Sequence, residues 1–549
     1  MLSTMQDVPL TVSAIFTHGQ KVHRRSRVLT FDGDGFREAT FAEVGERTER
    51  LANALRGIGV EPDDRVATFM WNTQEHLEAY FAVPGTGAVL HTLNLRLPAD
   101  QLVHIANQAE DKVVLVHSTV APLLAKVAAD LKTVEQIVIV DDGAPLSPEV
   151  RAALESLGNV HDYETLLRAA PTGYDWPEMD ERSAAAMCFT SGTTGDPKGV
   201  VYSHRSTWLH AFAANNTGAL TLDERDRILI IVPQFHVNAW GYPYAAWMHG
   251  ADIVMPSRWL QGEPIAKMIE KAKVTLSAGV PTIWASLAQH VADHPADLSS
   301  VRFLLSGGSA LPRVLVETFD AMGITMLQGW GMTETSPVCA VSAPPADAVP
   351  SQDDPTLAGW RLKAGRIVPG VQLRIVTDSG QVAPWDGETT GEIEARGPWI
   401  TASYYMVEDP EKFHDGWLRT GDIGSIDDHG YLTISDRVKD VIKSGGEWIS
   451  SVALENEIMG HPDVAEASVV GVRDERWGER PLAVVVRKSG AGVSASDLRS
   501  WLEPRVARFW LPERWTFVDE LPKTTVGKFD KKVIRAREAS GDLDIEHAG

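Results

Sequence analysis

Short, uninterrupted hydrophobic runs alternate with helical patterns through the first two-thirds of the chain. The clearest runs are residues 66–70, 113–116, 137–140, 184–188, 228–232, 274–278 and 301–305. Between the first two runs, residues 74–81 have the spacing of a helix. Continuous hydrophobic strands separated by helices are typical of parallel sheets that are buried on both faces. The pattern therefore predicts an α/β fold.

Three of these predicted strands end in unusual loops. The loops are residues 233–236, 279–282 and 306–309, and they are built largely from Pro, Gly, Ser and other turn-forming or polar residues. In open α/β sheets, ligands bind beyond the carboxyl ends of the strands. We therefore expect a pocket where these three loops meet.

The pattern changes twice further along the chain. From about residue 370 short strands alternate with turns, which predicts a β-rich subdomain over about 365–435. Four of the five residues 436–440 are charged, which on composition alone fits either an exposed turn or a hinge. Beyond them, Ser494 and Asp497 resemble a capping box at the start of a helix. We expect an N-terminal domain over 1–435, a hinge over 436–441 and a small α+β C-terminal domain over 442–549.

Length and charge exclude some classes of protein. At 549 residues the chain is too long for one hydrophobic core, so several packed units are expected. The net charge of -23 disfavours a nucleic-acid-binding role, which needs a basic face. A local basic patch remains compatible with that charge.

The cysteines and the N-terminus bear on location. Cys188 and Cys339 lie far apart in apolar surroundings, which favours small core residues over a disulfide or a metal site. The first eight residues lack a positive segment and a long hydrophobic run, so no signal peptide is predicted. No window approaches the ~20 apolar residues of a transmembrane segment. We expect a cytoplasmic protein, with peripheral membrane contact as an alternative.

A dense run of hydroxyl and glycine residues over 189–199 is the most informative part of the chain. Glycines allow backbone N–H groups to face an anion, and Ser191, Thr193 and Thr194 add hydroxyl donors. Lys198 adds a positive charge that attracts phosphate oxygens. The run lacks the Gly-Lys-Ser/Thr ending of a Walker loop. It predicts a phosphate-binding loop, with a solvated linker as the alternative.

This run resembles the signature of the adenylate-forming enzymes, which include acyl-CoA synthetases, peptide-synthetase adenylation domains and firefly-type luciferases. Four further stretches resemble motifs of the same family in the same order: 328–335, 419–422 with 436–437, 439–450 and 522–528. The resemblance covers most of the chain. It implies a large domain of two parallel-type sheets with a β-rich subdomain, joined by a hinge to a small mobile domain.

The resemblance implies an ATP site with named residues. Trp330, between two glycines, would offer an exposed ring face to a purine, although a core tryptophan is the alternative. Glu334 and Thr190 would hold Mg²⁺, a hard ion that prefers oxygen ligands. Asp422 and Arg437 would bind the ribose and phosphate oxygens. The remaining expected ATP or AMP contacts are Ser191, Gly192, Thr193, Thr194, Lys198, Gly308, Ser309, Gln328, Gly329, Thr333, Lys439, Lys443 and Trp448.

The resemblance also assigns roles to the C-terminal domain. Lys528 would bridge the substrate carboxylate and the α-phosphate, lowering the barrier to an encounter between two anions. Rotation about Lys439 would then replace Lys528 with the face around Lys443, Gly445 and Gly446, where coenzyme A binds. Lys443, Arg473, Arg476 and Arg480 could supply positive charge for its phosphates, although only Lys443 belongs to a motif of the family.

The segment 232–240 resembles the gate of bacterial long-chain fatty acyl-CoA synthetases, with His236, Val237 and Trp240 beside the acyl group. It also resembles methylthiopropionate-CoA ligases, which take a short acid. Gln234 stands where these relatives often carry methionine, which disfavours very long chains. A packed core aromatic is the alternative for Trp240.

The implied function is an ATP-dependent fatty acid–CoA ligase that uses ATP, Mg²⁺ and coenzyme A, and the implied assembly is a homodimer. A medium- or long-chain acid is favoured. The alternatives are a short-acid ligase, a luciferase-like oxygenase and a non-catalytic sensor. A carrier-protein loader is disfavoured because no carrier domain adjoins.

Overall fold

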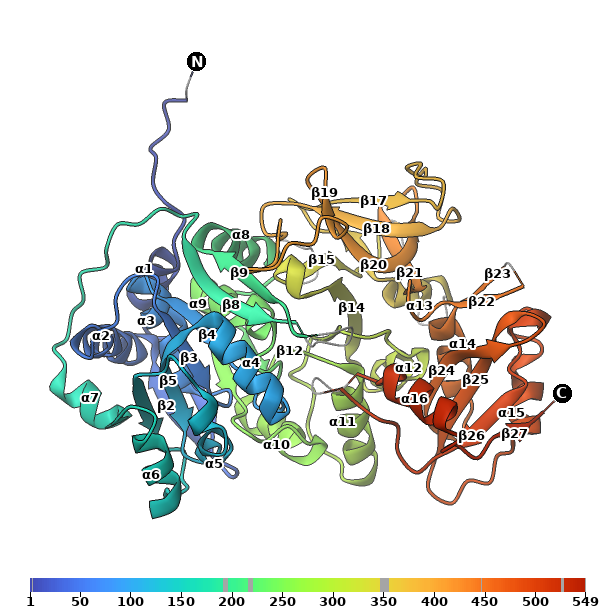
Figure 1. Cartoon of the computed structure of the whole chain (residues 1–549), viewed down its shortest axis with the longest axis horizontal. Coiled ribbons are helices and arrows are strands. Elements are labelled where there is room, and N and C mark those ends of the chain that lie inside the picture. Colours follow the sequence, from blue (N-terminus) through green and yellow to red (C-terminus); the bar gives the residue numbers. More distant parts are fainter. Residues whose placement is uncertain are drawn as a thin grey trace.

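The computed structural model describes residues 1, 3–190, 196–215, 221–345, 355–445, 447–524 and 528–548. Figure 1 shows the N-terminal part on one side, a layer of antiparallel strands above the centre, and the C-terminal part on the other side. Within the described residues, no helix has the length and hydropathy needed to cross a membrane.

The first sheet lies in the N-terminal part and has seven strands among the described residues. In spatial order these are β7 (Asn159–Asp162), β6 (Gln136–Val140), β5 (Asp111–His117), β3 (Arg65–Phe69), β4 (Val89–Thr92), β8 (Ala184–Phe189) and β9 (Gly199–Ser203). All neighbours are parallel except β8 and β9, which form an antiparallel hairpin. The hydrophobic runs at 66–70, 113–116, 137–140 and 184–188 are therefore confirmed as strands.

The second sheet has a parallel part and an antiparallel part that share one strand. The parallel part contains β14 (Thr325–Gly331), β13 (Phe303–Ser306), β12 (Leu276–Gly279), β10 (Arg227–Ile230), β11 (Asp252–Met255) and β1 (Arg27–Phe31), with β2 (Phe36–Thr40) antiparallel at the edge. Beyond β14 follow β15 (Val338–Val341), β16 (Gly365–Ile367), β21 (Tyr431–Arg437), β20 (Trp417–Ile426), β18 (Gly391–Arg396) and β17 (Gln372–Val376), with β19 (Phe413–His414) on β20. The predicted β-rich subdomain is thus continuous with this sheet through β14.

Helices cover both faces of the parallel sheets, as the uninterrupted hydrophobic strands require. In β3, Val66 belongs to the core between the sheets, whereas Ala67 and Phe69 belong to the core on the outer face. The N-terminal helices are α1 (Val12–Val22), α2 (Phe41–Gly57), α3 (Gln74–Gly85), α4 (Ala99–Ala109), α5 (Ala121–Ala125), α6 (Pro148–Glu155), α7 (Tyr163–Ala169), α8 (His204–Ala214), α9 (Tyr242–His249), α10 (Gly262–Ala272), α11 (Pro281–Asp293), α12 (Arg313–Ala321) and α13 (Pro355–Leu362). The helix predicted over 74–81 is confirmed as part of α3.

The C-terminal part has its own sheet and core. The sheet contains β23 (Glu447–Ile449), β22 (Ile442–Ser444), β25 (Gly478–Arg487), β26 (Arg514–Phe517) and β27 (Glu546–His547), with β24 (Val464–Asp474) paired to β25. Its helices are α14 (Ser451–Met459), α15 (Ala495–Leu502) and α16 (Lys531–Ser540). The predicted capping box is confirmed: the Ser494 hydroxyl accepts from the Asp497 N–H at 3.2 Å, and the Asp497 carboxylate accepts from the Ser494 N–H at 3.0 Å.

Candidate active site

The β8–β9 hairpin carries the predicted phosphate-binding loop. The Thr190 N–H donates to the Lys198 carbonyl at 2.9 Å, and the Lys198 N–H donates to the Thr190 hydroxyl at 3.0 Å. These two bonds close the base of the loop. Ser191, Gly192, Thr193 and Thr194 lie outside the described residues, so their phosphate contacts stay predictions.

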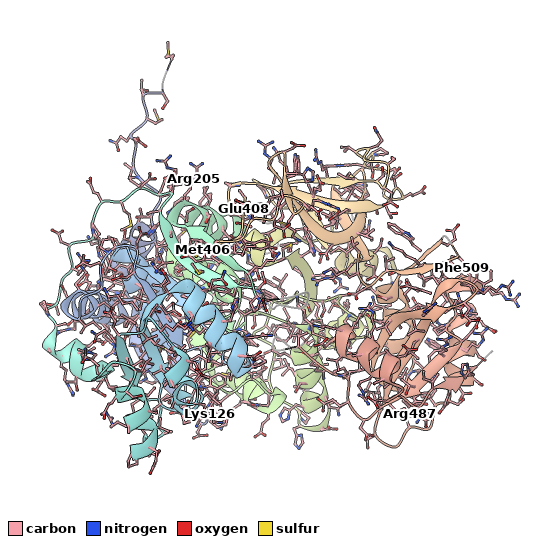
Figure 2. The ribbon with its side chains drawn as sticks, viewed as in Figure 1. Lys126, Arg205, Met406, Glu408, Arg487 and Phe509 are labelled. Carbon is pink, nitrogen blue, oxygen red and sulfur yellow. The ribbon has the colours of Figure 1, made fainter. Side chains whose placement is uncertain are left out.

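A second loop crosses the end of this hairpin and pairs with its lysine. The Tyr405 N–H donates to the Gly199 carbonyl at 2.8 Å, and Figure 2 shows Met406 and Glu408 of this loop beside β8 and β9. The Lys198 ammonium lies 2.8 Å from Asp409 Oδ2. That ammonium holds the pKa of Asp409 below its usual range. Lys198 therefore has a protein anion as its partner in this structure.

Tyr404 connects the lysine to the predicted metal-binding carboxylate. Its ring centroid lies 4.8 Å from the Lys198 ammonium, and its hydroxyl donates to Glu334 Oε1 at 2.5 Å. Burial, and then the charge of Glu334, raise the pKa of Tyr404, so the phenol stays protonated. Glu334 is 5% exposed, so its carboxylate is buried.

The oxygen chemistry of this corner fits a hard cation. Glu334 offers a buried carboxylate and Thr190 a hydroxyl, and Mg²⁺ prefers such ligands together with substrate phosphates and water. Within the described ranges, no cluster of three or more His, Cys, Asp or Glu is arranged to hold a metal. Glu334 and Thr190 supply two protein oxygens, which leaves further positions around such an ion to phosphate and water oxygens.

Strand β14 changes its pairing within the second predicted motif. Gln328 pairs in parallel with Ser306 of β13, whereas Gly329 pairs antiparallel with Val341 of β15. The register shifts between Trp330 and the next residue. The motif thus lies where the parallel sheet ends, the position at which a ligand site was expected.

Trp330 is placed differently from its prediction. The residue is 8% exposed, and its indole N–H donates to Asp422 Oδ2 at 2.8 Å. The expectation of an exposed ring face is wrong, because this hydrogen bond and the surrounding core enclose the ring. The Gln328 carboxamide oxygen likewise accepts from the Leu311 N–H at 2.8 Å, so it fixes a loop within the fold.

Asp422 and Arg437 face each other across the antiparallel pair β20–β21. The Arg437 guanidinium lies 3.2 Å from Asp422 Oδ1. This carboxylate is the main cause of the raised pKa of Arg437. Both oxygens of Asp422 are thus held in place, one by Trp330 and the other by Arg437, and the group keeps lone pairs for hydroxyl donors.

Lys528 reaches this group of residues from the C-terminal part. A methyl group on Gly308 would lie 3.3 Å from Lys528 Cε and 3.9 Å from its ammonium, and Gly308 has a φ of +82°. Burial, followed by the charge of Arg437, lowers the pKa of Lys528 to about 8, while Asp422 and Glu334 act in the opposite direction. The neighbouring Ser309 is exposed and Thr333 is buried.

Trp240 lies beside Gly307, which precedes Gly308, and His236 is within the electrostatic reach of Lys528. Burial, then the charges of Lys528 and Arg96, lower the pKa of His236 to about 3, so its imidazole is neutral. A methyl group on Gly307 would meet the Trp240 ring at 2.8 Å. Val237, the third predicted gate residue, is buried in the same short turn.

The hairpin β22–β23 carries the residues predicted to bind coenzyme A. Lys443 and Trp448 pair across it and Gly445 lies at its turn, whereas Gly446 lies outside the described residues. A methyl group on Gly445 would meet the Trp477 ring at 2.7 Å. In Figure 1 the hairpin projects at the upper edge of the C-terminal part. In this arrangement the residue of the C-terminal part that lies against Gly308 is Lys528. Lys439, the expected pivot, is exposed.

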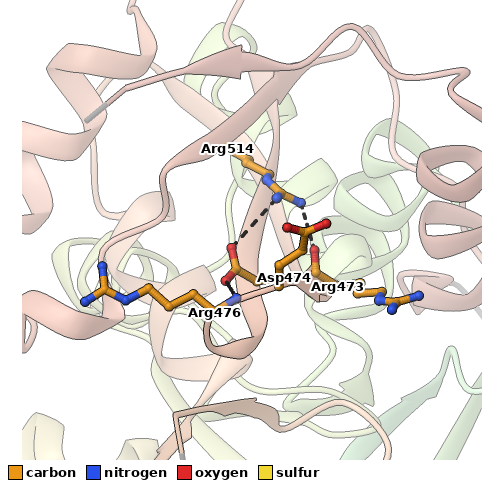
Figure 3. A pocket seen from close by; sticks show the side chains of 5 residues that line it. Arg473, Asp474, Arg476 and Arg514 are labelled. Atoms are coloured by element: carbon orange, nitrogen blue, oxygen red, sulfur yellow. Dashed lines mark hydrogen bonds and ion pairs between the residues drawn. The ribbon is translucent and has the colours of Figure 1, made fainter.

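Three of the arginines near this hairpin surround a surface depression. Figure 3 shows Arg473, Arg476 and Arg514 around Asp474, with Arg514 also donating to the Arg473 carbonyl at 3.3 Å. Arg480 does not belong to this positive surface. Its guanidinium is buried and donates to Ser444 and to backbone carbonyls, so the expectation that it supplies charge to a ligand is wrong.

Sequence reasoning missed Tyr404 and Asp409. Both lie more than 200 residues from Lys198 along the chain, in a loop without a regular pattern. Their contacts with Lys198 and Glu334 depend on the tertiary fold. The aromatic-rich stretch 404–413 was the only local signal available.

Family models and similar proteins all point to the same enzyme family. Residues 16–405 match the family model described as AMP-binding enzyme, and residues 453–528 match that of the AMP-binding enzyme C-terminal domain. The chain is 40% identical to a 3-methylmercaptopropionyl-CoA ligase of Ruegeria lacuscaerulensis over 97% of its length and 98% of the relative's. It is 39% identical to a medium-chain-fatty-acid–CoA ligase of Ectopseudomonas oleovorans, over 99% and 98%. A long-chain-fatty-acid–CoA ligase of Thermus thermophilus is 42% identical, over 97% and 96%.

Solved structures agree with the fold. An anthranilate CoA ligase in complex with anthranoyl-AMP superposes with a TM-score of 0.84 at 26% identity, covering 98% of this chain and all of that one. ATP-bound MatB from Rhodopseudomonas palustris gives a TM-score of 0.81 at 26% identity, covering 96% of this chain and 99% of that one. The α/β fold with a large N-terminal and a small C-terminal domain is therefore confirmed.

Proposed function

The chain belongs to the AMP-binding enzyme family and is an AMP-forming acyl-CoA ligase, and from that premise we propose that its acid substrate is a medium- or long-chain fatty acid. One observation carries the mechanism: the Lys528 side chain lies against Gly308, within the electrostatic reach of Glu334, Asp422 and Arg437. An ammonium in that position would lie between the substrate carboxylate and the α-phosphate of ATP.

The first half-reaction joins these two anions. A carboxylate oxygen attacks the α-phosphorus of ATP, the bond to the pyrophosphate oxygen breaks, and pyrophosphate leaves with its electron pair. Lys528 contributes by offsetting the repulsion between the attacking and attacked groups, in surroundings where a charge is poorly screened. Asp422, fixed by Trp330 and Arg437, would accept the ribose hydroxyl hydrogens and orient the nucleotide.

Glu334 and Thr190 are the residues that would hold Mg²⁺, which supplies positive charge to the phosphates of ATP. Tyr404 fixes the Glu334 carboxylate through its hydroxyl. Lys198 would exchange Asp409 for a phosphate oxygen when ATP binds. Because that exchange replaces one anion by another, it orients the phosphate more than it adds affinity.

The second half-reaction needs a different face of the small domain. The thiol of coenzyme A loses its proton and attacks the acyl carbon, the bond to the AMP oxygen breaks, and AMP leaves. We propose that the domain over 442–549 rotates about Lys439, so that Lys528 departs and the hairpin with Lys443 and Gly445 arrives. The arginines in Figure 3 would then be available to the phosphates of coenzyme A.

A short acid is the second candidate substrate. The 3-methylmercaptopropionyl-CoA ligases are as similar to this chain as the fatty acid ligases are. Gln234 favours this candidate: its side chain is fully buried, and among the described residues neither Oε1 nor Nε2 has a hydrogen-bond partner. A buried carboxamide without a partner destabilises an apolar neighbourhood, so a substrate with a polar or polarisable atom would suit it better than a plain alkyl chain.

The test is to measure pyrophosphate and AMP release with ATP, Mg²⁺ and coenzyme A across acids from propionate through methylthiopropionate to palmitate. Highest kcat/KM with medium or long chains supports the fatty acid proposal, and preference for the shortest acids transfers the protein to the short-acid ligases. Oxygen-dependent AMP release would indicate an oxygenase. Absence of pyrophosphate and AMP release with every acid would indicate a non-catalytic sensor. Trp240→Ala should flatten the dependence on chain length, and unchanged kinetics across the panel would count against its role as a gate.

We also propose a homodimer, from the family resemblance, and separately a cytoplasmic location, which fits the two buried free cysteines. Sedimentation at working concentration tests the first, and a monomer would refute it. Fractionation of cells tests the second, and recovery with the membranes would support peripheral attachment instead.

A further inference from the structure

The turn that carries Trp240 has an unusual backbone. Val237, Asn238, Ala239 and Trp240 have φ angles of 39°, 40°, 52° and 56°, and Gly241 follows at 75°. Successive left-handed residues other than glycine are disfavoured because Cβ crowds the following carbonyl oxygen, and a β-branched residue such as Val237 is affected most. Such a conformation persists only where surrounding contacts hold it.

The contacts that hold this turn converge on one side chain. Asn238 Oδ1 accepts from the Cys188 thiol at 2.6 Å and from the Thr92 hydroxyl at 3.3 Å. The Thr92 hydroxyl and the Cys188 sulfur are themselves 3.3 Å apart. All three residues are buried, with exposures of 7%, 1% and 2% for Asn238, Cys188 and Thr92.

The sulfur also lies against the backbone of the turn. Burial raises the pKa of Cys188 to about 11, while the Thr92 hydroxyl and the backbone at Asn238 and Val237 act in the opposite direction. The thiol is therefore protonated and can donate. Asparagine is itself one of the few residue types that adopt the left-handed region readily, which suits it to this position.

This group of three side chains links two parts of the active site. Cys188 is the penultimate residue of β8, two residues before Thr190, and Thr92 ends β4. At the other end of the turn, the Trp240 ring lies against Gly307, next to the glycine that contacts Lys528. A continuous series of contacts thus runs from the strand of the phosphate-binding loop to the gate tryptophan.

We propose that Asn238 is a positioning residue. Held by Cys188 and Thr92, it fixes the left-handed turn and so keeps the Trp240 ring against Gly307. The position of that ring determines which acids are admitted. The part concerning acids rests on the proposed function, in which Trp240 limits access to the acyl site. The part concerning the position of the ring does not depend on any activity.

The position of the ring can be measured directly. In protein labelled with 5-fluorotryptophan, Trp240→Phe assigns the Trp240 line among the ¹⁹F resonances of the 17 tryptophans. Asn238→Ala and Cys188→Ala should each shift or split that line. Cys188→Ser keeps a donor and should retain the wild-type line.

A matched control uses the other buried cysteine. Cys339 lies in β15 and is fully buried, and Cys339→Ala should leave the Trp240 line in place. If Asn238→Ala does not fold, Thr92→Val removes only one hydroxyl, with Thr92→Ser as its rescue. A Trp240 line that stays unchanged in the donor-deleting variants, or moves equally in Cys339→Ala, would overturn the proposal.

The kinetic test uses the ratio of kcat/KM for palmitate to that for butyrate. Asn238→Ala should change this ratio about threefold to tenfold, the range expected for one or two hydrogen bonds, in the same direction as Trp240→Ala. In the Trp240→Ala background it should have no further effect, because it acts through that ring. Additive changes would contradict positioning. If the wild-type protein is inactive with every acid but the donor-deleting variants still shift the ¹⁹F line, the proposed function is refuted and the positioning role is supported.

Discussion

Two lysines define two contrasting regions of the active site. Lys198 of the large domain lies in an ion pair with Asp409 and over the ring of Tyr404. Lys528 of the small domain lies against Gly308. Burial and the charge of Arg437 lower its pKa to about 8, while the carboxylates of Asp422 and Glu334 act in the opposite direction. One cation has a fixed partner, while the other is brought in from a separate domain.

The difference indicates a division of labour. A cation that is already paired changes little when ATP arrives, so the Lys198 region is suited to holding the phosphates in one geometry. A desolvated cation gains most when two anions approach it, so Lys528 is suited to the step in which charge accumulates. Substitutions in the two regions should therefore reduce activity to different extents.

The largest expected effect follows removal of Lys528. Lys528→Ala should lower the rate of adenylation by two to three decades, since losing one charge-stabilising donor typically costs about 3–4 kcal/mol. The measurement is acid-dependent pyrophosphate release. Lys523→Ala is the matched control, because Lys523 pairs with Glu466 at the surface and should leave the rate unchanged. Near-normal pyrophosphate release by Lys528→Ala would contradict the proposed difference in role between Lys528 and Lys198.

The next effect concerns Asp422, the carboxylate proposed to orient the nucleotide. Asp422→Ala leaves the buried Trp330 indole N–H without its acceptor and removes the ion-pair partner of Arg437, whose side chain is 50% exposed. An unsatisfied buried donor costs about 1–3 kcal/mol. We expect KM for ATP to rise about tenfold to a hundredfold, with KM for the acid little changed. Equal increases in both values would point to general loss of structure.

The pH dependence of adenylation should report Lys528. Its pKa is lowered from 10.5 to about 8, and only the ammonium form carries the charge, so kcat/KM should fall about tenfold per pH unit above pH 8. Lys528→Arg remains charged and should lack this fall. The contribution of Lys528 to stability has the opposite sign: between about pH 8 and 10.5 the unfolded chain binds more protons, so that contribution rises with pH. An identical pH profile for both proteins would assign the titration to another group.

The smallest effect is expected at the paired lysine. Asp409→Asn removes a partly exposed ion pair, and such pairs contribute about 0–1 kcal/mol. We expect KM for ATP to change by less than about fivefold, falling if Lys198 is freed for phosphate. Titration of ATP binding measures it. A change as large as that of Asp422→Ala would mean that Asp409 itself contacts the nucleotide.

Much of the fold was predictable because its signals are local. The buried strands in both sheets have uninterrupted hydrophobic runs, and the helix at Ser494 begins with a capping box whose two members are three positions apart. The motif around Thr190 and Lys198 also follows from sequence, since both ends of a short hairpin loop must lie together. In each case the determining contacts lie within a few residues along the chain.

Other features depend on partners that are distant in sequence. Trp330 looked exposed between two glycines, yet it is enclosed by its bond to Asp422, 92 residues away. Arg480 looked available, but it is buried and its two Nη atoms donate to Ser444 and to backbone carbonyls. The contact of Asn238 with Cys188 spans 50 residues, and only the packed structure brings the two together.

The most direct test of the account separates the two half-reactions in one preparation of Lys528→Ala. Pyrophosphate release from ATP and palmitate measures the first, and acyl-CoA formation from supplied palmitoyl-adenylate and coenzyme A measures the second. We expect the rate of the first to fall by two to three decades, while the rate of the second remains within about twofold of wild type. Equal loss of both, or retention of both, would contradict the assignment of Lys528 to adenylation alone.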